Sequence, residues 1–458
     1  MMKPLRSALA TLAMLVVAAN VFAQTSEDLQ KRRQAVRDAM DPDSVMILRA
    51  SQPVPEVAFR QESNLYYLAG LNEPSAALIL YSSRRGPANP PAGPAPSGRT
   101  EVLFVQPAPG DAPATRGGPA TTPAAPLTRA GFPVVRPASD FQQAFESALL
   151  AASGTVYIDY PRPRSLSAPL SAEEQWLKAA RDRGASFTAK SASSLLSPIR
   201  PIKSPEEIAT LRAAADITAA AQREAMRSAK PGMFEYQVQS VIEHVFMVNG
   251  AAGPGFSTIV GSGGNSCVLH WSTNTRRTEP GDVVVMDIGA LYGMYTADIT
   301  RTIPIGGTFT KRQRDVYEVV LKANEEAIKM VAPGVNMSDI NTKVNEVLAD
   351  GLIALGLIKD KSGLRQYYTH GLSHSIGLQV HDLGGALTVG VLKPGMVITI
   401  EPGLYIPAES LGIRIEDDVV VTDTGHDVIS AAAPKAVAEI EKLMKEPGME
   451  FGRYLVKK

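Results

Sequence analysis

The sequence predicts an α/β (α+β) protein with two domains, the second of which is built from two related halves. Three observations support this fold class. Short apolar, strand-like runs alternate with helical stretches over the first 200 residues. A strongly capped helix follows, beginning at Pro205. Beyond that helix, two sequence patterns each occur twice, which indicates an internal duplication with an approximate two-fold axis.

The first predicted domain covers residues 24–200. Strand-like runs occur at residues 44–48, 77–81, 101–105 and 156–158, and a helical stretch covers residues 141–152. Two tracts rich in proline, glycine and alanine interrupt the pattern at residues 84–99 and 107–126. Such tracts cannot bury enough apolar surface to order themselves, so they are expected to be mobile surface loops.

The second predicted domain covers residues 201–458, and its first helix has a clear start. Ser204 is a good N-cap residue, Pro205 suits the first helical position, and Glu207 stands three residues past the cap. The helix is expected to end near Ser228, before a Pro-Gly pair.

Two patterns repeat within this second domain. Residues 231–246 and 333–348 both begin with Pro-Gly and carry apolar residues at the same offsets. Residues 280–289 and 394–403 share an opening Pro-Gly, an apolar strand, an acid seven positions after the proline and a glycine nine after it. The duplication therefore places Asp287 and Glu401 at equivalent positions.

The N-terminus is typical of a secretory signal peptide, expected to span residues 1–23. Lys3 and Arg6 precede a short apolar run, and small residues before Gln24 provide a cleavage site. The protein is therefore expected to be exported, to the periplasm or beyond the cell. The single cysteine, Cys267, cannot form an internal disulfide. The formal net charge is zero, so the sequence shows no excess of positive charge that would favour binding to nucleic acid or an anionic membrane. No membrane span is expected after cleavage.

Residues 370–382, HGLSHSIGLQVHD, hold three of the six histidines of the chain. His370 and His374 are four residues apart, as in helical zinc-protease motifs. However, no glutamate lies between them, and the glycines of the stretch are unfavourable inside a helix. If these histidines serve a metal or a reaction, their partners must come from elsewhere in the chain.

Four acids in the duplicated halves are candidate partners. A turn centred on Tyr292-Gly293 would set Asp287 and Asp298 opposite one another on paired strands, and a longer hairpin would bring Glu401 together with Glu416. Buried carboxylates are costly without a cation. Oxygen-rich ligation with one imidazole favours a metal such as Mn²⁺, and shared carboxylates suit a pair of ions that support hydrolysis.

Five stretches in order carry a resemblance to a known family. They are GFSTIVGSGGNSCVLHW, MDIGALYGMYTADITRTIP, HGLSHSIGLQVHD, TIEPGLY and GIRIEDDVVVT. Residues 201–429 resemble the catalytic domain of the pita-bread metallopeptidases, most closely the aminopeptidase P (Xaa-Pro aminopeptidase) family. FRQESNLYYLAGLNEP, residues 59–74, resembles that family's creatinase-like N-terminal domain. The resemblance implies a pseudo-two-fold pita-bread fold for the second domain.

The resemblance also implies the metal ligands. Asp287 would bind one ion, Asp298 and Glu416 would bridge both ions, and His374 and Glu401 would complete the other site. The implied cofactor is two divalent ions, Mn²⁺ in the first place, with Zn²⁺ and Co²⁺ as alternatives.

Further residues gain roles from the resemblance. Glu401 would also shuttle the proton, and Arg414 would orient the bridging carboxylates, with Tyr405 as a weaker candidate for such a role. Three histidines would contact the substrate and its tetrahedral intermediate: His270, His370 and His381.

The implied activity is removal of an N-terminal residue that precedes proline in a peptide, by a homodimer or homotetramer. Alternatives from the same fold are prolidase, which cleaves Xaa-Pro dipeptides, methionine aminopeptidase, and creatinase, which lacks the metal ligands. A peptide-binding relative without catalysis is a further alternative, although all five ligands are present. Ser373 within HGLSH resembles aminopeptidase P, whereas many prolidases have glycine there.

Overall fold

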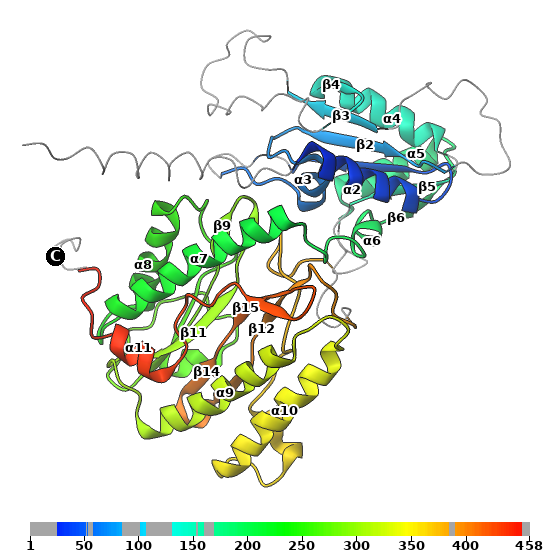
Figure 1. Ribbon diagram of the computed structural model, residues 1–458. Helices are drawn as coiled ribbons and strands as arrows, with labels where there is room; N and C mark the ends of the chain where they lie inside the picture. Colours follow the sequence, from blue (N-terminus) through cyan, green and yellow to red (C-terminus); the bar gives the residue numbers. More distant parts are fainter. Residues whose placement is uncertain are drawn as a thin grey trace, which may run out of the picture. The chain divides into compact units, whose positions relative to one another are not determined.

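The computed structural model describes residues 25–51, 53, 58–84, 101–106, 131–152, 154–159, 169–383 and 390–450. The chain divides into two compact units, one within Ala23–Ile199 and one within Arg200–Lys458 (Figure 1). Residues 1–23 and both Pro-rich tracts, apart from residue 84, lie outside the described residues. Within the described ranges, no helix is both long enough and apolar enough to cross a membrane.

A six-stranded sheet forms the centre of the N-terminal unit. Its strands are β1 (Val45–Arg49), β2 (Ala77–Tyr81), β3 (Glu101–Val105), β4 (Val135–Pro137), β5 (Thr155–Ile158) and β6 (Thr188–Lys190). Their order is β4-β3-β2-β1-β5-β6, with β1, β2 and β3 antiparallel and the outer strands parallel to their neighbours. The predicted strands at 77–81 and 101–105 are confirmed at the same bounds, and the other two within one residue.

Helices pack around this sheet. They are α2 (Ser26–Ala39), α3 (Ser63–Ala69), α4 (Phe141–Ala151), α5 (Ala172–Asp182) and the short α6 (Ser193–Leu196). Phe145 of α4 is buried against the sheet and meets the ring of Trp176 of α5 edge-on, with 4.9 Å between the ring centroids. The α5 helix begins with a full capping box between Ser171 and Glu174. The predicted helix at 141–152 is confirmed and ends one residue early.

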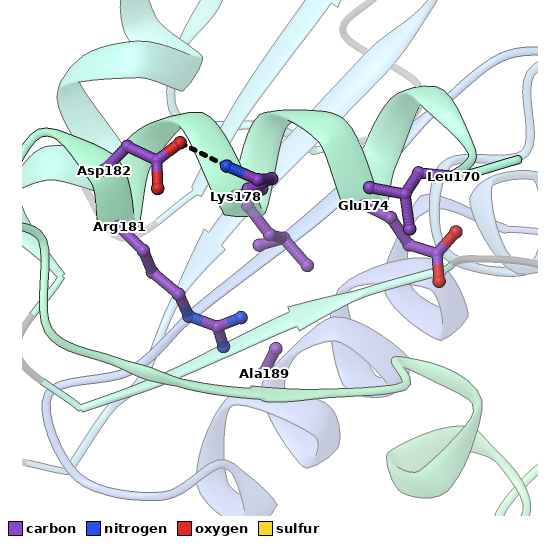
Figure 2. Close-up of a pocket in the computed structure, with 7 residues that line it drawn as sticks. Leu170, Glu174, Lys178, Arg181, Asp182 and Ala189 are labelled. Atoms are coloured by element: carbon purple, nitrogen blue, oxygen red, sulfur yellow. Dashed lines mark hydrogen bonds and ion pairs between the residues drawn. The ribbon is translucent and has the colours of Figure 1, made fainter. Parts of the chain in front are cut away.

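A hollow of about 430 Å³ lies between α5 and β6 (Figure 2). Its floor is apolar, with Leu177 buried, and its charged rim is already paired. Lys178 Nζ lies 2.6 Å from Asp182 Oδ2, and the guanidinium of Arg181 lies 4.9 Å from the ring centroid of Phe187.

The second unit contains two helix pairs and two sets of strands. Its helices are α7 (Pro205–Ser228), α8 (Glu235–Val248), α9 (Lys311–Met330), α10 (Met337–Ala354) and α11 (Val437–Leu443). The predicted helix from Pro205 to Ser228 is confirmed at both ends, including its capping box. The α9 helix begins with the same device, formed by Thr310 and Gln313. The two halves thus share their helix-start chemistry as well as their apolar pattern.

The strands of the second unit follow the same duplication. They are β7 (Ile259–Ser262), β8 (Val283–Ile288), β9 (Leu291–Tyr292), β10 (Tyr295–Thr296), β11 (Ile299–Pro304), β12 (Val397–Ile400), β13 (Gly403–Ile406), β14 (Leu411–Arg414), β15 (Asp417–Val421) and β16 (His426–Val428). One hairpin pairs β8 with β11 and continues through β9 and β10. The other pairs β12 with β15 and continues through β13 and β14. In Figure 1, α7 and α8 lie along one side of these strands and α9 and α10 along the other.

The first hairpin differs from the prediction by one residue in its turn. Its two-residue turn is Gly293–Met294, with φ angles of 55° and 73°, as a type I′ turn requires. Asp287 therefore pairs with Thr300, so the predicted direct pairing of Asp287 with Asp298 is wrong. When the turn centre shifts by one residue, the partner of each strand residue shifts by two positions along the opposite strand. Asp298 consequently lies diagonally from Asp287, on the same face of the hairpin.

The second hairpin brings its acids face to face. Ile400 pairs with Asp417 and Gly403 with Arg414, which sets Glu401 opposite Glu416 at the junction of the two ladders. A further segment runs antiparallel to β12. It is held by hydrogen bonds from Thr399 N to His374 O, Glu401 N to Leu372 O and Ile376 N to Val397 O. The segment with the clustered histidines is therefore extended rather than helical, as its glycines predicted.

Candidate metal centre

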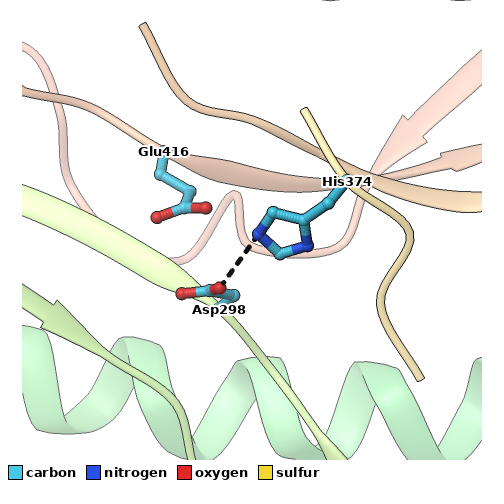
Figure 3. A group of neighbouring side chains, drawn as sticks. All are labelled: Asp298, His374 and Glu416. Carbon is cyan, nitrogen blue, oxygen red and sulfur yellow. Dashed lines mark ion pairs between the residues drawn. The ribbon is translucent and has the colours of Figure 1, made fainter. Parts of the chain in front are cut away.

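Three of the predicted ligands form a compact group. Side-chain ligand atoms of Asp298, His374 and Glu416 all lie within 4.8 Å of one another, and Figure 3 shows the three side chains pointing toward a common centre. The Nε2 atom of His374 is 3.5 Å from Oδ2 of Asp298. Asp298 lies just before β11, His374 lies in the segment beside β12, and Glu416 lies just before β15. The fold therefore brings the three residues together from separate parts of the chain.

The other two predicted ligands border this group. Glu401 Oε1 lies 3.6 Å from Nε2 of His374. Asp287 lies close enough to Asp298 for its charge to raise the pKa of Asp298, and the Oδ1 atoms of both are buried without a donor among the described residues. An ionised carboxylate can only accept hydrogen bonds, so each of these Oδ1 atoms is an unsatisfied acceptor. The structure thus brings all five predicted ligands together.

The electrostatics of the group call for a cation. Burial raises the pKa of Asp298, and the neighbouring charges of Asp287 and Asp418 raise it further. Burial, followed by the charge of Asp298, raises the pKa of Glu416. Burial also raises the pKa of Glu401. Four carboxylates so close together cannot all stay ionised without positive charge between them, and divalent ions would supply it. The donor set fits a divalent metal centre.

Arg414 is the fixed positive charge beside the acids. Its Nη2 donates to Oδ2 of Asp287 at 2.7 Å and to the carbonyl of Leu269 at 3.2 Å, while its Nε donates to Thr300 Oγ1 at 3.2 Å. Thr300 in turn donates to Oε2 of Glu416 at 2.7 Å. Arg414 therefore contacts Asp287 directly and reaches Glu416 through Thr300, which fits its predicted orienting role.

A hydrogen-bonded chain runs from Arg414 to His370. Arg414 Nη1 donates to the hydroxyl of Tyr405 at 3.0 Å, and that hydroxyl lies 2.8 Å from Nε2 of His370. Nδ1 of His370 lies 2.8 Å from the carbonyl of Gly371. Because arginine can only donate, Tyr405 donates onward to Nε2, and Nδ1 of a neutral imidazole carries the hydrogen. Burial and the charge of Arg414 lower the pKa of His370 to about 4, which keeps it neutral at physiological pH.

The remaining predicted histidines surround this group. The ring of His381 meets that of His374 edge-on, with 4.3 Å between centroids, and burial lowers the pKa of His381. His270 is exposed and lies close enough to influence the pKa of both His370 and His381. The three predicted substrate-contacting histidines are thus grouped around the candidate metal centre.

The loop with His270 is anchored by a residue that the sequence analysis missed. Glu235 is fully buried at the start of α8. Its Oε1 accepts hydrogen bonds from Ser262 N at 2.8 Å, Ser262 Oγ at 2.7 Å and Asn265 Nδ2 at 3.0 Å. Its Oε2 accepts from Trp271 Nε1 at 2.8 Å and Arg276 N at 3.0 Å. In the sequence this acid is an ordinary first-turn glutamate, because its partners are far along the chain.

We expect Glu235→Gln to lower the free energy of unfolding by about 1–3 kcal/mol. Both oxygens of Glu235 accept hydrogen bonds, so the NH₂ group of glutamine would point at donors in place of one of these oxygens. Denaturant unfolding measures the change. Glu243→Gln in the same helix is the matched control, because both of its acceptor contacts, from Gln239 and Thr258, use a single oxygen that glutamine retains. Equal losses in the two variants would contradict this account of Glu235.

Asp382 is a second missed residue. It follows His381 directly and pairs with the guanidinium of Arg200, and its Oδ2 lies 3.3 Å from Nζ of Lys203. Lys203 also donates to Ser375 Oγ at 3.2 Å. This buried cluster fixes the end of the histidine-bearing segment. An acid beside a histidine was visible in the sequence, but its basic partners lie some 180 residues earlier.

Comparisons with known proteins agree with this geometry. Residues 209–423 match the model of metallopeptidase family M24, and residues 29–157 match that of the aminopeptidase P N-terminal domain. Together these matches cover both structural units.

Individual relatives match along nearly the whole chain. Xaa-Pro aminopeptidase of Escherichia coli K12 is 35% identical over 444 residues, covering 91% of this chain and 97% of that protein. The Haemophilus influenzae Xaa-Pro aminopeptidase is 32% identical with the same coverage. A solved structure of E. coli aminopeptidase P with the inhibitor Pro-Leu is 34% identical with a TM-score of 0.78, covering 92% of this chain and 98% of that one. The chain therefore belongs to the aminopeptidase P (Xaa-Pro aminopeptidase) family of M24 metallopeptidases.

Proposed function

We propose that this protein is a dimetal exopeptidase that hydrolyses the bond between an N-terminal residue and a following proline. The convergence of Asp298, His374 and Glu416, bordered by Asp287 and Glu401, is the observation that carries the proposal. The full-length likeness to Xaa-Pro aminopeptidases supports the substrate class.

The chain offers ligands for two divalent ions. Asp287 would hold one ion, His374 and Glu401 the other, and Asp298 and Glu416 would be shared between them. Four carboxylates and one imidazole suit Mn²⁺ better than sulfur-preferring metals. When bound, such ions act as Lewis acids that make hydroxide available near neutral pH and polarise a carbonyl.

Glu401 is proposed to move the proton. Its Oε2 lies 3.6 Å from Nδ1 of His370 and its Oε1 lies 3.6 Å from Nε2 of His374, so it stands between the ligand group and the substrate-contacting histidines. The proline nitrogen must gain one proton as the C–N bond breaks, so that it leaves as a neutral secondary amine. Glu401 would accept a proton from the attacking water and deliver it to that nitrogen.

The three histidines around the ligand group are proposed to contact the substrate. His370 is fixed by Tyr405 and by the Gly371 carbonyl, so its ring is held in one orientation before substrate arrives. His381 and His270 lie near it and can donate to the scissile peptide and its tetrahedral intermediate. Because both ring nitrogens of His370 are already engaged, its proposed contact with the substrate is through packing of the ring, whereas His381 and His270 would supply donors to a developing oxyanion.

Arg414 bears on the choice between an aminopeptidase and a dipeptidase. A dipeptidase must bind the free carboxylate of proline, usually with a cation. Here Arg414 is already engaged by Asp287, Tyr405 and Thr300, so it is not available for that purpose. A Pyrococcus furiosus Xaa-Pro dipeptidase is 37% identical, but the match covers only 63% of that protein and 50% of this chain.

We therefore expect a higher kcat/KM for Xaa-Pro-Yaa tripeptides and longer peptides than for Xaa-Pro dipeptides. Peptides with alanine in place of proline should be poor substrates, because the site is expected to be shaped for the fixed φ of proline. Product analysis by chromatography on a matched peptide series measures both effects. Rapid cleavage of Xaa-Pro with Xaa-Pro-Yaa left intact would identify a prolidase instead.

We also propose that the protein is exported, to the periplasm or the medium, and functions as a homodimer or homotetramer. The basic start and apolar run of residues 1–23 support export. Mass spectrometry of the mature protein should find Gln24 at its N-terminus. A mature chain that keeps residues 1–23 would contradict cleavage. Light scattering on the same sample measures the oligomeric state.

A further inference from the structure

Two buried amide side chains occupy equivalent positions in the two halves of the second unit. Gln222 of α7 lies nine residues before Pro231, and Asn324 of α9 lies nine residues before Pro333, where each proline opens a repeated Pro-Gly pattern. Both side chains are fully buried. A buried amide needs hydrogen-bond partners to offset its desolvation, so both side chains are expected to be bonded inside the fold.

Gln222 joins the two strands of the first hairpin. Its Nε2 donates to the carbonyl of Met286 at 3.0 Å and to the carbonyl of Ile299 at 2.8 Å. These carbonyls flank the Asp287–Thr300 pair, one just before Asp287 and the other just before Thr300. One NH₂ group therefore holds β8 and β11 together at the point where the ligand acids emerge.

Asn324 makes the equivalent contact in the second hairpin. Its Nδ2 donates to the carbonyl of Ile400 at 3.0 Å. Ile400 comes just before Glu401, as Met286 comes just before Asp287. In each half, an amide from the long helix thus binds the carbonyl next to the duplicated ligand acid.

The oxygen ends of the two amides differ. Asn324 Oδ1 accepts from Lys435 Nζ at 2.8 Å, and the same Nζ lies 2.7 Å from Oδ2 of Asp417. Gln222 Oε1 is buried with no partner among the described residues. Its amide orientation is nevertheless determined, since the reverse orientation would set oxygen against two carbonyl oxygens. Gln222 therefore keeps two bonds from its NH₂ group although its oxygen is left unsatisfied. This indicates that the two donor bonds, and not the acceptor, are the reason for an amide at this position.

Such contacts matter because the ligand acids repel one another. Ligand oxygens of Asp298 and Glu416 lie within 4.8 Å of each other, so the two carboxylates would move apart if their strands could shift. The α7 helix can hold its strands closely because its buried face is rich in small residues: Ala214, Ala215, Ala219, Ala221 and Ala225.

We infer that Gln222 and Asn324 are a pseudo-symmetric pair of positioning residues, each of which fixes the peptide unit next to a metal-binding acid. This inference rests on the proposed dimetal function. It assigns to the two helices a role in holding the ligands at the spacing that two cations need, in addition to covering the strands.

The test uses variants that keep volume but remove the donor. Gln222→Met and Asn324→Leu are made in the full-length protein, which is chelated and then titrated with Mn²⁺. We expect the Kd for Mn²⁺ to rise about 10- to 100-fold, as for other residues that orient metal ligands. The visible absorption spectrum of the Co²⁺-loaded variants should also shift, because a misplaced carboxylate changes the ligand field.

Two controls separate positioning from stability. Thr210→Val in α7 removes a bond to Glu206 O, and Arg314→Leu in α9 removes the ion pair with Glu441 of α11, and neither contact reaches a ligand-bearing strand. Both controls should lose stability while Kd and the Co²⁺ spectrum stay unchanged. Gln222→Asn keeps the amide but shortens its reach, and should give a smaller rise in Kd than Gln222→Met.

If Gln222→Met and Asn324→Leu bind Mn²⁺ as tightly as the parent, with an unchanged Co²⁺ spectrum, the inference is overturned. Should Gln222→Met fail to fold, Asn324→Leu and Gln222→Asn still decide it. Failure of the proposed function would look different, because the parent protein itself would then bind no Mn²⁺.

Discussion

Asp298→Ala is expected to abolish peptide hydrolysis and reduce bound metal. One oxygen donor is lost from both proposed ions at once, and the loss of several kcal/mol of transition-state stabilisation corresponds to at least about 1,000-fold in kcat/KM. The same change removes a buried carboxylate whose pKa is raised by burial and by Asp287. The chelated variant should therefore be at least as stable to unfolding as the chelated parent.

Three measurements on one preparation check this result: elemental analysis, kinetics with an Xaa-Pro-Yaa peptide, and thermal unfolding with and without Mn²⁺. Asp298→Asn is a second variant that keeps the side-chain volume of the parent. Like Asp298→Ala, it should bind metal more weakly than the parent and lose activity. The parent should gain thermal stability from Mn²⁺, and the variants should gain less. A variant that kept two metals and most of its activity would show that Asp298 is not a bridging ligand.

The second large effect separates ligands from substrate contacts. His374→Ala should lose both metal and activity, because Nε2 faces Asp298 and Glu401 at the centre of the group. His381→Ala should keep its metal but lose about 100-fold or more in kcat, since it removes a proposed donor to the substrate and leaves the acids untouched. Metal analysis and steady-state kinetics on both variants provide the comparison.

His426→Ala is the control for this pair. His426 lies away from the group, where its Nδ1 contacts the carbonyl of Val331 at 2.9 Å, so metal content and kcat should match the parent. Equal metal loss in His374→Ala and His381→Ala would overturn the roles given to the histidine-bearing segment.

Much of the fold could be predicted from the sequence because its signals are local. The helix from Pro205 to Ser228 is specified by a capping box at one end and Pro-Gly beyond the other. The strands of the N-terminal unit are short apolar runs with clear ends. The duplication was visible as repeated Pro-Gly patterns, and the two hairpins follow from it.

The hairpin register could not be predicted as reliably. Tyr292-Gly293 and Gly293-Met294 are both acceptable as a turn centre, and the choice depends on Met294 adopting a positive φ. No sequence rule favours methionine there, because the twist of the flanking strands determines the turn. A one-residue difference was enough to replace Asp298 by Thr300 as the partner of Asp287.

The supporting residues of the site were hidden for a different reason. Glu235, Asp382, Gln222 and Asn324 contact partners far along the chain, and the local sequence does not reveal those partners. The four acids were recognisable because acids at the ends of apolar strands are costly and lie in duplicated hairpins, whereas His374 was singled out as a ligand by the family resemblance. The role of a supporting polar residue becomes visible only when its contacts in the folded structure are known.

The central claim is that metal held by these acids makes the protein an Xaa-Pro aminopeptidase. The most direct measurement is a titration of the chelated protein with Mn²⁺, following bound metal and Xaa-Pro-Yaa hydrolysis in the same sample. The account predicts an inactive chelated protein, two Mn²⁺ ions bound per chain at saturation, and release of the N-terminal residue that rises with binding. Full hydrolysis without bound metal, or saturated Mn²⁺ binding without hydrolysis, would contradict it.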